Sequence, residues 1–270
     1  MASSDLSRYQ AVILCGGQGT RIRGVADNIP KPLIDVGGKP ILWHIMKTYS
    51  FYGIRRFILC LGYRGEAIID YFENYHSRTH DFTMTIKDRE QRKFGNETRA
   101  DRDIDDWEIT FALTGENTMT GGRIKRIRNY IDNELFFATY GDGLSDVDIN
   151  ALHRFHLEKG RSVTLTGVHL PTTFGIVESR EDGAITSFRE KPVLPGRING
   201  GYFVFSPAIF DHIEGDSTVL EDLPFKRMVR SGEIVMFPWD GFWHCMDTFK
   251  DHQELNKMWN DNKAPWKLWA

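Results

Sequence analysis

Near its start the chain places glycines and cations in a pattern suited to binding phosphate. The apolar run 11–15 enters a turn that reads Gly-Gly-Gln-Gly-Thr-Arg. Backbone N–H groups of such a turn can approach phosphate oxygens closely. Thr20 adds a hydroxyl donor and Arg21 a forked cation. Ten residues later, Lys31 stands between two prolines that restrict the backbone around its ammonium group. The segment therefore predicts a site for a polyphosphate.

The spacing of these glycines excludes two familiar nucleotide-binding loops. A dinucleotide-binding loop needs Gly-x-Gly-x-x-Gly, but from Gly17 the chain reads Gly-Gln-Gly-Thr-Arg-Ile. A Walker A loop needs Gly-x-x-x-x-Gly-Lys followed by Ser or Thr, and the chain has no such sequence. A dehydrogenase or a P-loop kinase is therefore not indicated.

Strands and helices that alternate along the chain must position these groups. Short apolar runs rich in β-branched or aromatic residues predict buried strands. The predicted strands are 11–15, 56–61, 135–140, 161–170 and 200–207. Apolar residues at helical spacing predict helices between them. The predicted helices lie within 39–53, 66–75 and 148–159.

This alternation predicts an α/β fold with a doubly wound, mostly parallel mixed sheet. Ligands of such sheets bind at the carboxyl ends of the strands. We therefore expect the Gly16 turn and the Gly-Asp-Gly sequence at 141–143 to lie at the same edge. Residues 1–10 are expected to form a disordered N-terminal extension, and residues 11–210 the core. Residues 211–270 are expected to form a small helical, aromatic C-terminal appendage.

The charged excursion 87–108 interrupts the core. It is interpreted as a solvated hairpin or mobile loop, with a lid or a subunit contact as the alternative. The chain has a formal net charge of −3 and a pI near 6.3, which gives no general case for nucleic-acid binding. No apolar run reaches the roughly 18 residues of a membrane span, and the start of the chain has no hydrophobic signal region. We therefore expect a cytoplasmic protein that binds neither nucleic acid nor membrane.

Cysteines and histidines give no sign of a zinc site or a disulfide framework. The three cysteines lie far apart with no Cys-x-x-Cys pair, and the two in the apolar runs 11–15 and 56–61 are interpreted as small hydrophobic residues. His153 and His156 share one face of the predicted helix 148–159, and we expect both to be exposed.

The motifs resemble those of the sugar-nucleotide pyrophosphorylases, nucleotidyltransferases that join a nucleoside triphosphate to a sugar 1-phosphate. The resemblance covers almost the whole chain after residue 10. Its motifs are GGQGTRIR, PKPL, GGKPIL, TYGDG, FREKP, INGGYFVF and GEIVMFPWDGFWHCMDT. GGKPILWHIMKTYS, TGENTMTGGRIKR and the tail KAPWKLW are most similar to the glucose-1-phosphate cytidylyltransferases. One departure is Ala26, where many members carry threonine.

The resemblance implies a Rossmann-like nucleotidyltransferase fold and transfer of CMP from CTP to glucose 1-phosphate, with release of pyrophosphate. Because two polyanions must meet, we expect a divalent metal and several cations. Mg²⁺ prefers carboxylate oxygens, and Asp142 and Asp247 match the family's magnesium ligands. Arg21 and Lys31 are the expected catalytic cations, which stabilise the leaving pyrophosphate. The alternative for Asp142 is a purely turn-forming aspartate between glycines.

Two sets of residues match the family's substrate contacts. The expected nucleotide-binding residues are Leu14, Gly16, Gly17, Gly19, Thr20, Arg21, Lys31, Met119, Thr120, Gly121, Gly122, Arg123 and Asp142. The expected sugar-phosphate-binding residues are Gly175, Glu190, Lys191, Asn199, Gly200 and Gly201. In the second set an ammonium suits the phosphate and a carboxylate suits sugar hydroxyls. The glycines can alternatively mark a bulge or tight turn, and Arg123 can belong to a solvated basic face.

Three alternatives stay open at this point. The chemistry is unchanged if the enzyme is a uridylyl- or thymidylyltransferase, or if it uses another sugar 1-phosphate. A more distant possibility is a non-catalytic subunit that binds a sugar nucleotide for regulation. Because the similar cytidylyltransferases assemble into symmetric oligomers, the resemblance also implies a homo-oligomer.

Overall fold

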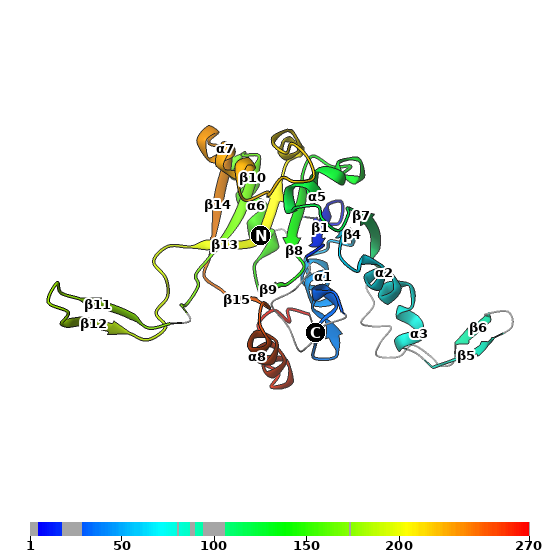
Figure 1. Ribbon diagram of the computed structural model, residues 1–270. Coiled ribbons are helices and arrows are strands. Elements are labelled where there is room, and N and C mark those ends of the chain that lie inside the picture. Colours follow the sequence, from blue (N-terminus) through cyan, green and yellow to red (C-terminus); the bar gives the residue numbers. More distant parts are fainter. Residues whose placement is uncertain are drawn as a thin grey trace.

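The computed structural model describes residues 5–17, 29–79, 81–86, 90–93, 106–172 and 174–269. A seven-stranded sheet lies at its centre, in the order β14-β10-β13-β8-β1-β4-β7 (Figure 1). The strands are β1 (Gln10–Cys15), β4 (Arg56–Leu61), β7 (Glu108–Leu113), β8 (Phe136–Tyr140), β10 (Val163–Val168), β13 (Ile198–Phe205) and β14 (Ile234–Trp239). Only β13 runs antiparallel to its neighbours within this sheet. The predicted mostly parallel α/β fold is confirmed.

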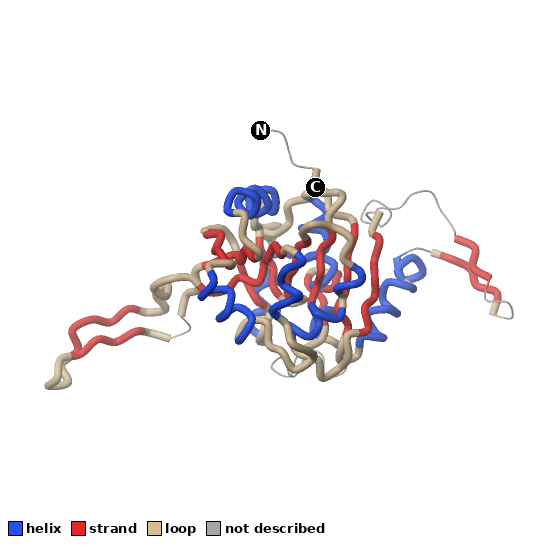
Figure 2. Tube along the Cα trace, turned by 90° about the horizontal axis from the view of Figure 1, so that it is seen from above, coloured by secondary structure: helices blue, strands red, loops and turns tan. Residues whose placement is uncertain are grey.

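Alternate residues of β1 enter two separate cores, one on each face of the sheet. Ala11 and Ile13 belong to the core that contains helix α1 (Ile41–Phe51), whereas Val12 and Leu14 belong to the core that contains Ile124 of α5 (Thr120–Arg126). Successive side chains of a strand point to opposite faces, so an all-apolar strand must be covered on both. Helices accordingly lie on both sides of the sheet (Figure 2).

The described ranges contain the three predicted helices, which begin and end close to the predicted positions, and four further helices. They are α1, α2 (Gly65–Glu73), α3 (Tyr75–Thr79), α5 (Thr120–Arg126), α6 (Ile149–Lys159), α7 (Leu223–Ser231) and α8 (Phe249–Asn260), with the 3₁₀ helices η1 (Lys31–Leu33), η2 (Arg128–Tyr130) and η3 (Pro207–His212). The carboxylate of Asp148 accepts a hydrogen bond from the N–H of Ala151 at the start of α6. Gly160, with φ of 59°, ends that helix as expected. None of the helices in the described ranges is long and apolar enough to cross a membrane.

Both ends of the chain are more closely packed than predicted. Leu6 and Tyr9 are buried in the core, so residues 5–10 are not the expected disordered extension. The segment after residue 211 is not a separate appendage, because β14 forms the edge of the main sheet beside β10. Trp266 is fully buried next to the ring of His44. Large apolar side chains near the termini explain both differences, because burying them is favourable.

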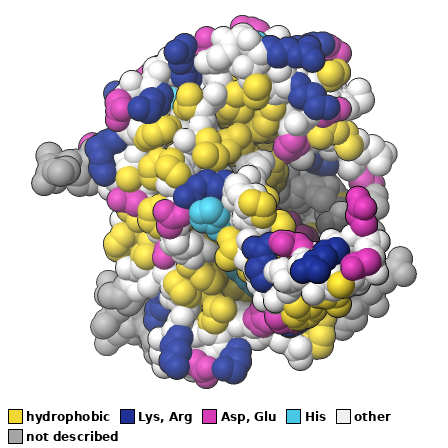
Figure 3. Space-filling model, turned by 90° about the vertical axis from the view of Figure 1, so that its left-hand side faces the viewer, with side chains coloured by type: hydrophobic (Ala, Val, Ile, Leu, Met, Phe, Trp, Pro, Cys, Tyr) yellow, Lys and Arg dark blue, Asp and Glu magenta, His cyan; other side chains and the backbone are white. Residues whose placement is uncertain are grey.

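Two β-hairpins project from the body of the molecule on opposite sides (Figure 1). One consists of β5 (Phe82–Thr85) and β6 (Glu90–Lys93), so the expected charged excursion contains part of a hairpin, while 87–89 and 94–105 lie outside the described residues. The other consists of β11 (Ile176–Ser179) and β12 (Ile185–Arg189). Figure 3 looks onto the side from which the second hairpin projects, and shows hydrophobic side chains among charged ones.

The expectation that His153 and His156 are exposed is wrong. Both side chains are buried between α6 and the sheet. The His156 Nδ1 atom lies 2.9 Å from the hydroxyl of Thr164 on β10, and the His153 ring packs beside Tyr9 and Phe137. Their shared helix face is therefore the inner face of α6.

Candidate active site

A cavity of about 420 Å³ opens at the carboxyl ends of β1 and β8, where the sequence predicted a ligand site. Several residues predicted to bind the nucleotide line it: Leu14, Gly16, Gly17, Lys31, Met119, Thr120, Arg123 and Asp142. Sequence reasoning missed other lining residues: Cys15, Pro32, Glu116, Asn117, Thr118, Tyr140 and Gly141. Their position directly beside predicted residues was the signal that could have found them. Gly19, Thr20 and Arg21 lie outside the described residues.

Arg123 explains why a glycine follows β1. A Cβ atom on Gly16 would lie 1.9 Å from the Arg123 guanidinium carbon, so a larger residue would displace the guanidinium. The guanidinium is buried and donates hydrogen bonds to the carbonyl oxygens of Gly16 at 3.0 Å, Leu61 at 3.2 Å and Gly115 at 2.8 Å. It also donates to the Thr114 hydroxyl at 2.7 Å.

These contacts give Arg123 a role that the sequence did not predict. Leu61 ends β4, Thr114 follows β7, and Gly16 follows β1. One cation thus ties three strand ends together at the rim of the cavity, so the solvated basic face considered for Arg123 is wrong. Burial lowers the pKa of the guanidinium from its ordinary value, yet an arginine stays charged in proteins.

The expected nucleotide contacts at Gly121 and Gly122 are not on the cavity wall. The N–H of Gly121 donates to the carbonyl of Thr218 at 2.9 Å. A Cβ atom on Gly122 would lie 2.6 Å from backbone atoms of Asp216. These glycines allow α5 to pack closely against the segment that carries Asp216 and Thr218, which is a structural requirement rather than a ligand contact.

Lys31 and Asp142, which line the cavity, converge with Asp247. The Lys31 Nζ atom lies 2.6 Å from Asp142 Oδ2 and 2.6 Å from Asp247 Oδ1. The Lys31 side chain is only 12% exposed. Burial lowers the pKa of its ammonium, but the charge of Asp142 and the hydrogen bonds to both carboxylates outweigh this and raise that pKa above its ordinary value. The residue therefore carries a fixed positive charge.

A small two-stranded sheet brings the distant aspartates together. β9 (Gly143–Ser145) pairs antiparallel with β15 (Trp243–Cys245), with Cys245 opposite Gly143. The pairing continues one step further, because the N–H of Met246 donates to the carbonyl of Asp142 at 2.9 Å. Asp142 and Asp247 therefore leave the same end of this ladder.

The N-terminus of α8 holds Asp247 in place from the other side. The carboxylate of Asp251 accepts hydrogen bonds from the N–H groups of Asp247 at 3.0 Å and Thr248 at 2.7 Å. The Thr248 hydroxyl in turn accepts from the N–H of Asp251, which completes a capping box. The backbone of Asp247 is thus fixed independently of any ligand.

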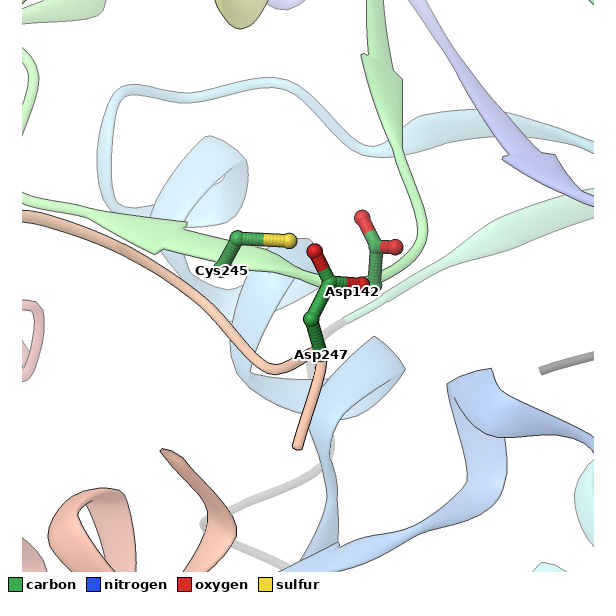
Figure 4. Close-up of side chains that lie close together, drawn as sticks. All are labelled: Asp142, Cys245 and Asp247. Atoms are coloured by element: carbon green, nitrogen blue, oxygen red, sulfur yellow. The ribbon is translucent and has the colours of Figure 1, made fainter. Parts of the chain in front are cut away.

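The donor atoms at this point fit a divalent cation. One oxygen each of Asp142 and Asp247 lies within 4.8 Å of the other and of the Cys245 sulfur (Figure 4). Carboxylate oxygens are the ligands that Mg²⁺ prefers. The sequence did not predict this place for Cys245, whose sulfur faces the two carboxylates. Burial, and then the charge of Asp142, raises the pKa of the Cys245 thiol well above its ordinary value.

A second group of possible ligands lies close by. His244, Asp251 and Glu254 also bring donor atoms within 4.8 Å of one another. The His244 Nε2 atom is 3.4 Å from Asp251 Oδ1 and 4.0 Å from Glu254 Oε2. The other carboxylate oxygen of Asp251 accepts a hydrogen bond from the Asp247 N–H. The group of His244, Asp251 and Glu254 therefore helps to position Asp247 as a metal ligand.

Three of the expected sugar-phosphate-binding residues, Asn199, Gly200 and Gly201, lie next to the cavity. Asn199 and Gly201 contact Tyr140, which lines it. The amide of Asn199 donates to the Tyr140 hydroxyl at 3.5 Å, and that hydroxyl also bonds to the carboxylate of Glu221. Gly201 has a φ of 76°, and a Cβ atom there would lie 2.4 Å from the Tyr140 ring. The carbonyl of Gly200 accepts a hydrogen bond from the Trp243 indole at 2.7 Å. These residues therefore position a wall of the cavity.

The rest of this set lies at the base of the β11–β12 hairpin. A Cβ atom on Gly175 would lie 3.0 Å from Glu190 Oε2, so the glycine leaves room for that carboxylate. Lys191 has a φ of 46° and an exposed ammonium 3.7 Å from Glu190 Oε1. None of the six expected sugar-phosphate residues is among those that line the cavity in the described part of the chain.

Comparisons with known proteins agree with this architecture. A family model described as "Nucleotidyl transferase" matches residues 10–244. The chain is 44% identical over 261 residues to a probable glucose-1-phosphate cytidylyltransferase of Bacillus subtilis, covering 96% of this chain and all of that protein. It is also 44% identical over 262 residues to the glucose-1-phosphate cytidylyltransferase of Salmonella typhimurium, covering 96% and 99%.

Solved structures show the same fold. The crystal structure of HddC from Yersinia pseudotuberculosis aligns with a TM-score of 0.68 at 24% identity, over 93% of this chain and 99% of that one. A putative glucose-1-phosphate thymidylyltransferase from Bacillus anthracis aligns with a TM-score of 0.65 at 14% identity, over 94% and 96%. Sequence match, fold and the convergence of Lys31 with two aspartates lead to one conclusion: the chain belongs to the nucleotidyl transferase family.

Proposed function

We propose that this protein transfers CMP from CTP to α-D-glucose 1-phosphate, giving CDP-glucose and pyrophosphate. The observation that carries the proposal is the buried Lys31 ammonium, 2.6 Å from both Asp142 and Asp247 at a cavity suited to a nucleotide. The substrate pair comes from the two relatives at 44% identity, which bear the names of glucose-1-phosphate cytidylyltransferases.

The chemistry asks the protein to align two anions and to offset their charge. A phosphate oxygen of the sugar phosphate is already ionised at neutral pH and attacks the α-phosphorus, while the bond to the pyrophosphate oxygen breaks in line. No serine or cysteine nucleophile is required. In this proposal the Lys31 ammonium neutralises the charge that develops on the leaving pyrophosphate.

Mg²⁺ is the proposed cofactor, held by Asp142 and Asp247. When bound, it neutralises phosphate charge and orients the triphosphate. The chain's own groups do the rest: Gly16 and Gly17 line the cavity, and the backbone N–H groups of such a glycine turn can donate to phosphate oxygens. Lys31 keeps the two carboxylates together before substrate binds.

The segment from Glu116 to Thr120 is the proposed base-binding wall. It lines the cavity and is anchored by the Met119 N–H, which donates to the Asp216 carbonyl at 2.8 Å. Cytosine presents an amino donor beside its N3 and O2 acceptors, and uracil reverses the polarity at two of these positions. Backbone and side-chain polar groups of such a wall can therefore separate the two bases.

Glu190 and Lys191 are the proposed sugar-phosphate contacts, with the ammonium on the phosphate and the carboxylate on sugar hydroxyls. Their place at the base of an exposed hairpin requires that the hairpin base closes toward the cavity when substrate binds. Such closure is common in enzymes that assemble a site around two substrates.

Association of copies of this chain is also part of the proposal. The β11–β12 hairpin exposes apolar side chains, which include Val177, Ile185 and Phe188. An isolated two-stranded hairpin is only marginally stable in water, so a second copy that covers it would stabilise it. Light scattering of the purified protein should give a multiple of the 31.2 kDa chain mass, and a monomer would contradict this part.

The test is an assay of pyrophosphate release with Mg²⁺, glucose 1-phosphate and each of CTP, UTP, dTTP and GTP in turn. We expect CTP to give the highest kcat/KM. A preference for UTP or dTTP would retain the chemistry and overturn the base assignment. No release with any triphosphate and any hexose 1-phosphate would favour a non-catalytic subunit.

A further inference from the structure

Cys245 adds a sulfur donor to the carboxylates of Asp142 and Asp247. Its Sγ atom and one oxygen each of Asp142 and Asp247 all lie within 4.8 Å of one another, and the side chain extends toward the aspartates (Figure 4). The main chain of Cys245 is fixed by its pairing with Gly143. The three donors therefore converge without a change in backbone.

A sulfur donor changes which cations the group can hold. Mg²⁺ takes oxygen ligands and has little use for sulfur, whereas a thiolate favours softer cations such as Zn²⁺. Zinc binds sulfur at about 2.3 Å and carboxylate oxygen at about 2.0–2.2 Å, commonly in a tetrahedron with a water in an open position. The Cys245 sulfur and the two carboxylate oxygens provide three ligands of the types that zinc binds and leave one position open for water.

The surroundings hold these donors as a metal site requires. The Met246 N–H donates to the Asp142 carbonyl, and the Asp251 carboxylate accepts from the Asp247 N–H, so two of the three donor residues are fixed from outside the group. Lys31 lies between the carboxylates and competes with any cation for their oxygens.

We propose that Asp142, Cys245 and Asp247 form a mixed oxygen–sulfur site that binds a thiophilic divalent cation of the zinc type, in competition with magnesium. As the metal–sulfur bond forms, the S–H bond breaks and its proton passes to solvent, so no oxidant or reductant takes part. A zinc-type cation at this place inhibits turnover, because it displaces the magnesium that the reaction uses. The inhibition rests on the proposed function, whereas the binding does not.

The other cysteines provide an internal control. Cys60 is fully buried in β4, and within the described residues it belongs to no group of possible metal ligands. A thiol signal that depends on Cys245 and not on Cys60 therefore reports this site. Cys60→Ala and Cys245→Ser are the matched pair, with Cys245→Ala as a second variant in case the serine hydroxyl itself binds metal.

The experiment uses Co²⁺ as a spectroscopic substitute for Zn²⁺ on the reduced full-length protein. We expect wild type and Cys60→Ala to show a sulfur-to-cobalt charge-transfer band in the near ultraviolet that saturates at one Co²⁺ per chain. Cys245→Ser and Cys245→Ala should lack it. Competition with Zn²⁺ should show that loss of the sulfur weakens zinc binding by about tenfold or more. Thermal melts confirm that each variant is folded.

The cobalt spectrum tests metal binding at Cys245, whereas pyrophosphate release tests the proposed transferase activity, so the two can fail independently. Visible d–d bands without a charge-transfer band in wild type would mean that Co²⁺ binds the carboxylates alone, which overturns the inference. A charge-transfer band that persists in Cys245→Ser would also overturn it. A band that depends on Cys245, in a protein that releases no pyrophosphate from CTP, would support the inference and contradict the proposed function.

Discussion

Two regions of the molecule that are expected to bind the same pair of substrates are built in opposite ways. Asp142 and Asp247 are fixed by the β9–β15 ladder, the capping box of α8 and the bridging Lys31 ammonium. Glu190 and Lys191 lie at the base of a two-stranded hairpin and contact mainly each other, across 3.7 Å at an exposed surface. The half of the site with Asp142 and Asp247 is thus formed before substrate binds. The half with Glu190 and Lys191 is exposed and needs the substrate or a second copy of the chain to cover it.

The difference separates the tasks of the two halves. Charge neutralisation at a reacting phosphate is most effective when the groups need no reorganisation during the reaction. Selection of a sugar tolerates a mobile contact, because binding energy can be used to close the site. Changes in the fixed half should therefore lower kcat, whereas changes in the hairpin half should raise KM for the sugar phosphate.

The largest effect is expected from a neutral side chain in the fixed half. Asp142→Asn removes one carboxylate charge next to Lys31, so both metal affinity and phosphate alignment suffer, and we expect kcat to fall by about a hundredfold or more. Asp182→Asn makes the same chemical change in the turn of the β11–β12 hairpin, where the side chain accepts a hydrogen bond from the Ala184 N–H. Steady-state kinetics of both variants measure the contrast. Similar losses in the two would remove the distinction between the halves.

Asp251→Ala tests whether the fixed half depends on the capping box. The change frees the Asp247 backbone, and we expect the Mg²⁺ concentration at half-maximal rate to rise about tenfold. Asp148→Ala, which removes the cap of α6, is the matched control, since both changes cost about 1 kcal/mol of stability. Titration of the rate with Mg²⁺, with thermal melts alongside, separates the two. Equal Mg²⁺ dependence in both variants would refute a positioning role for Asp251.

A smaller and different effect is expected in the hairpin half. Lys191→Ala removes a charged contact to the sugar phosphate, so KM for glucose 1-phosphate should rise about tenfold, while KM for CTP stays unchanged. Lys159→Ala, at another exposed lysine paired with a neighbouring glutamate, should change neither constant. If Lys191→Ala lowers kcat and leaves both KM values intact, the hairpin does not bind the sugar phosphate.

The smallest expected effect is on the free energy of unfolding and comes from His156, which is buried between α6 and the central sheet. Burial lowers the pKa of His156 from 6.5 to about 4. Between these values the unfolded chain binds the proton and the folded chain does not, so the free energy of unfolding falls as pH falls from 6.5 toward 4. The slope from one such histidine is at most about 1.4 kcal/mol per pH unit. Urea denaturation across this range should show a flatter profile for His156→Gln, and an unchanged slope would contradict the assignment. The exposed His169→Gln is the control.

The sequence was most informative where local pattern and position coincide. Apolar runs and helical spacing predicted β1, β4, β8, α1 and α6 because each element buries a face that can be recognised within a few residues. Because ligands of parallel α/β sheets bind at the carboxyl ends of the strands, the sequence predicted that Gly16 and Asp142 lie at the same edge of the sheet. The cavity lies at that edge. The place of Asp247 beside Asp142 came from resemblance alone, since no local pattern of its own marks it.

The features that were missed depend on contacts between distant segments. Cys245 faces the aspartates because β15 pairs with β9, and two three-residue strands leave almost no periodic signal. In the sequence Arg123 belongs to a basic run typical of a protein surface. In the fold the ends of three strands surround its guanidinium. Gly121 and Gly122 resemble a ligand loop, but they serve the packing of α5.

The central claim is that Lys31, bridged to Asp142 and Asp247, is the cation that makes nucleotidyl transfer fast. Single-turnover pyrophosphate release from CTP and glucose 1-phosphate in saturating Mg²⁺ measures this step without product release. We expect Lys31→Ala to slow it by about a hundredfold or more, with little change in the affinity for glucose 1-phosphate. A single-turnover rate equal to that of wild type would contradict the account.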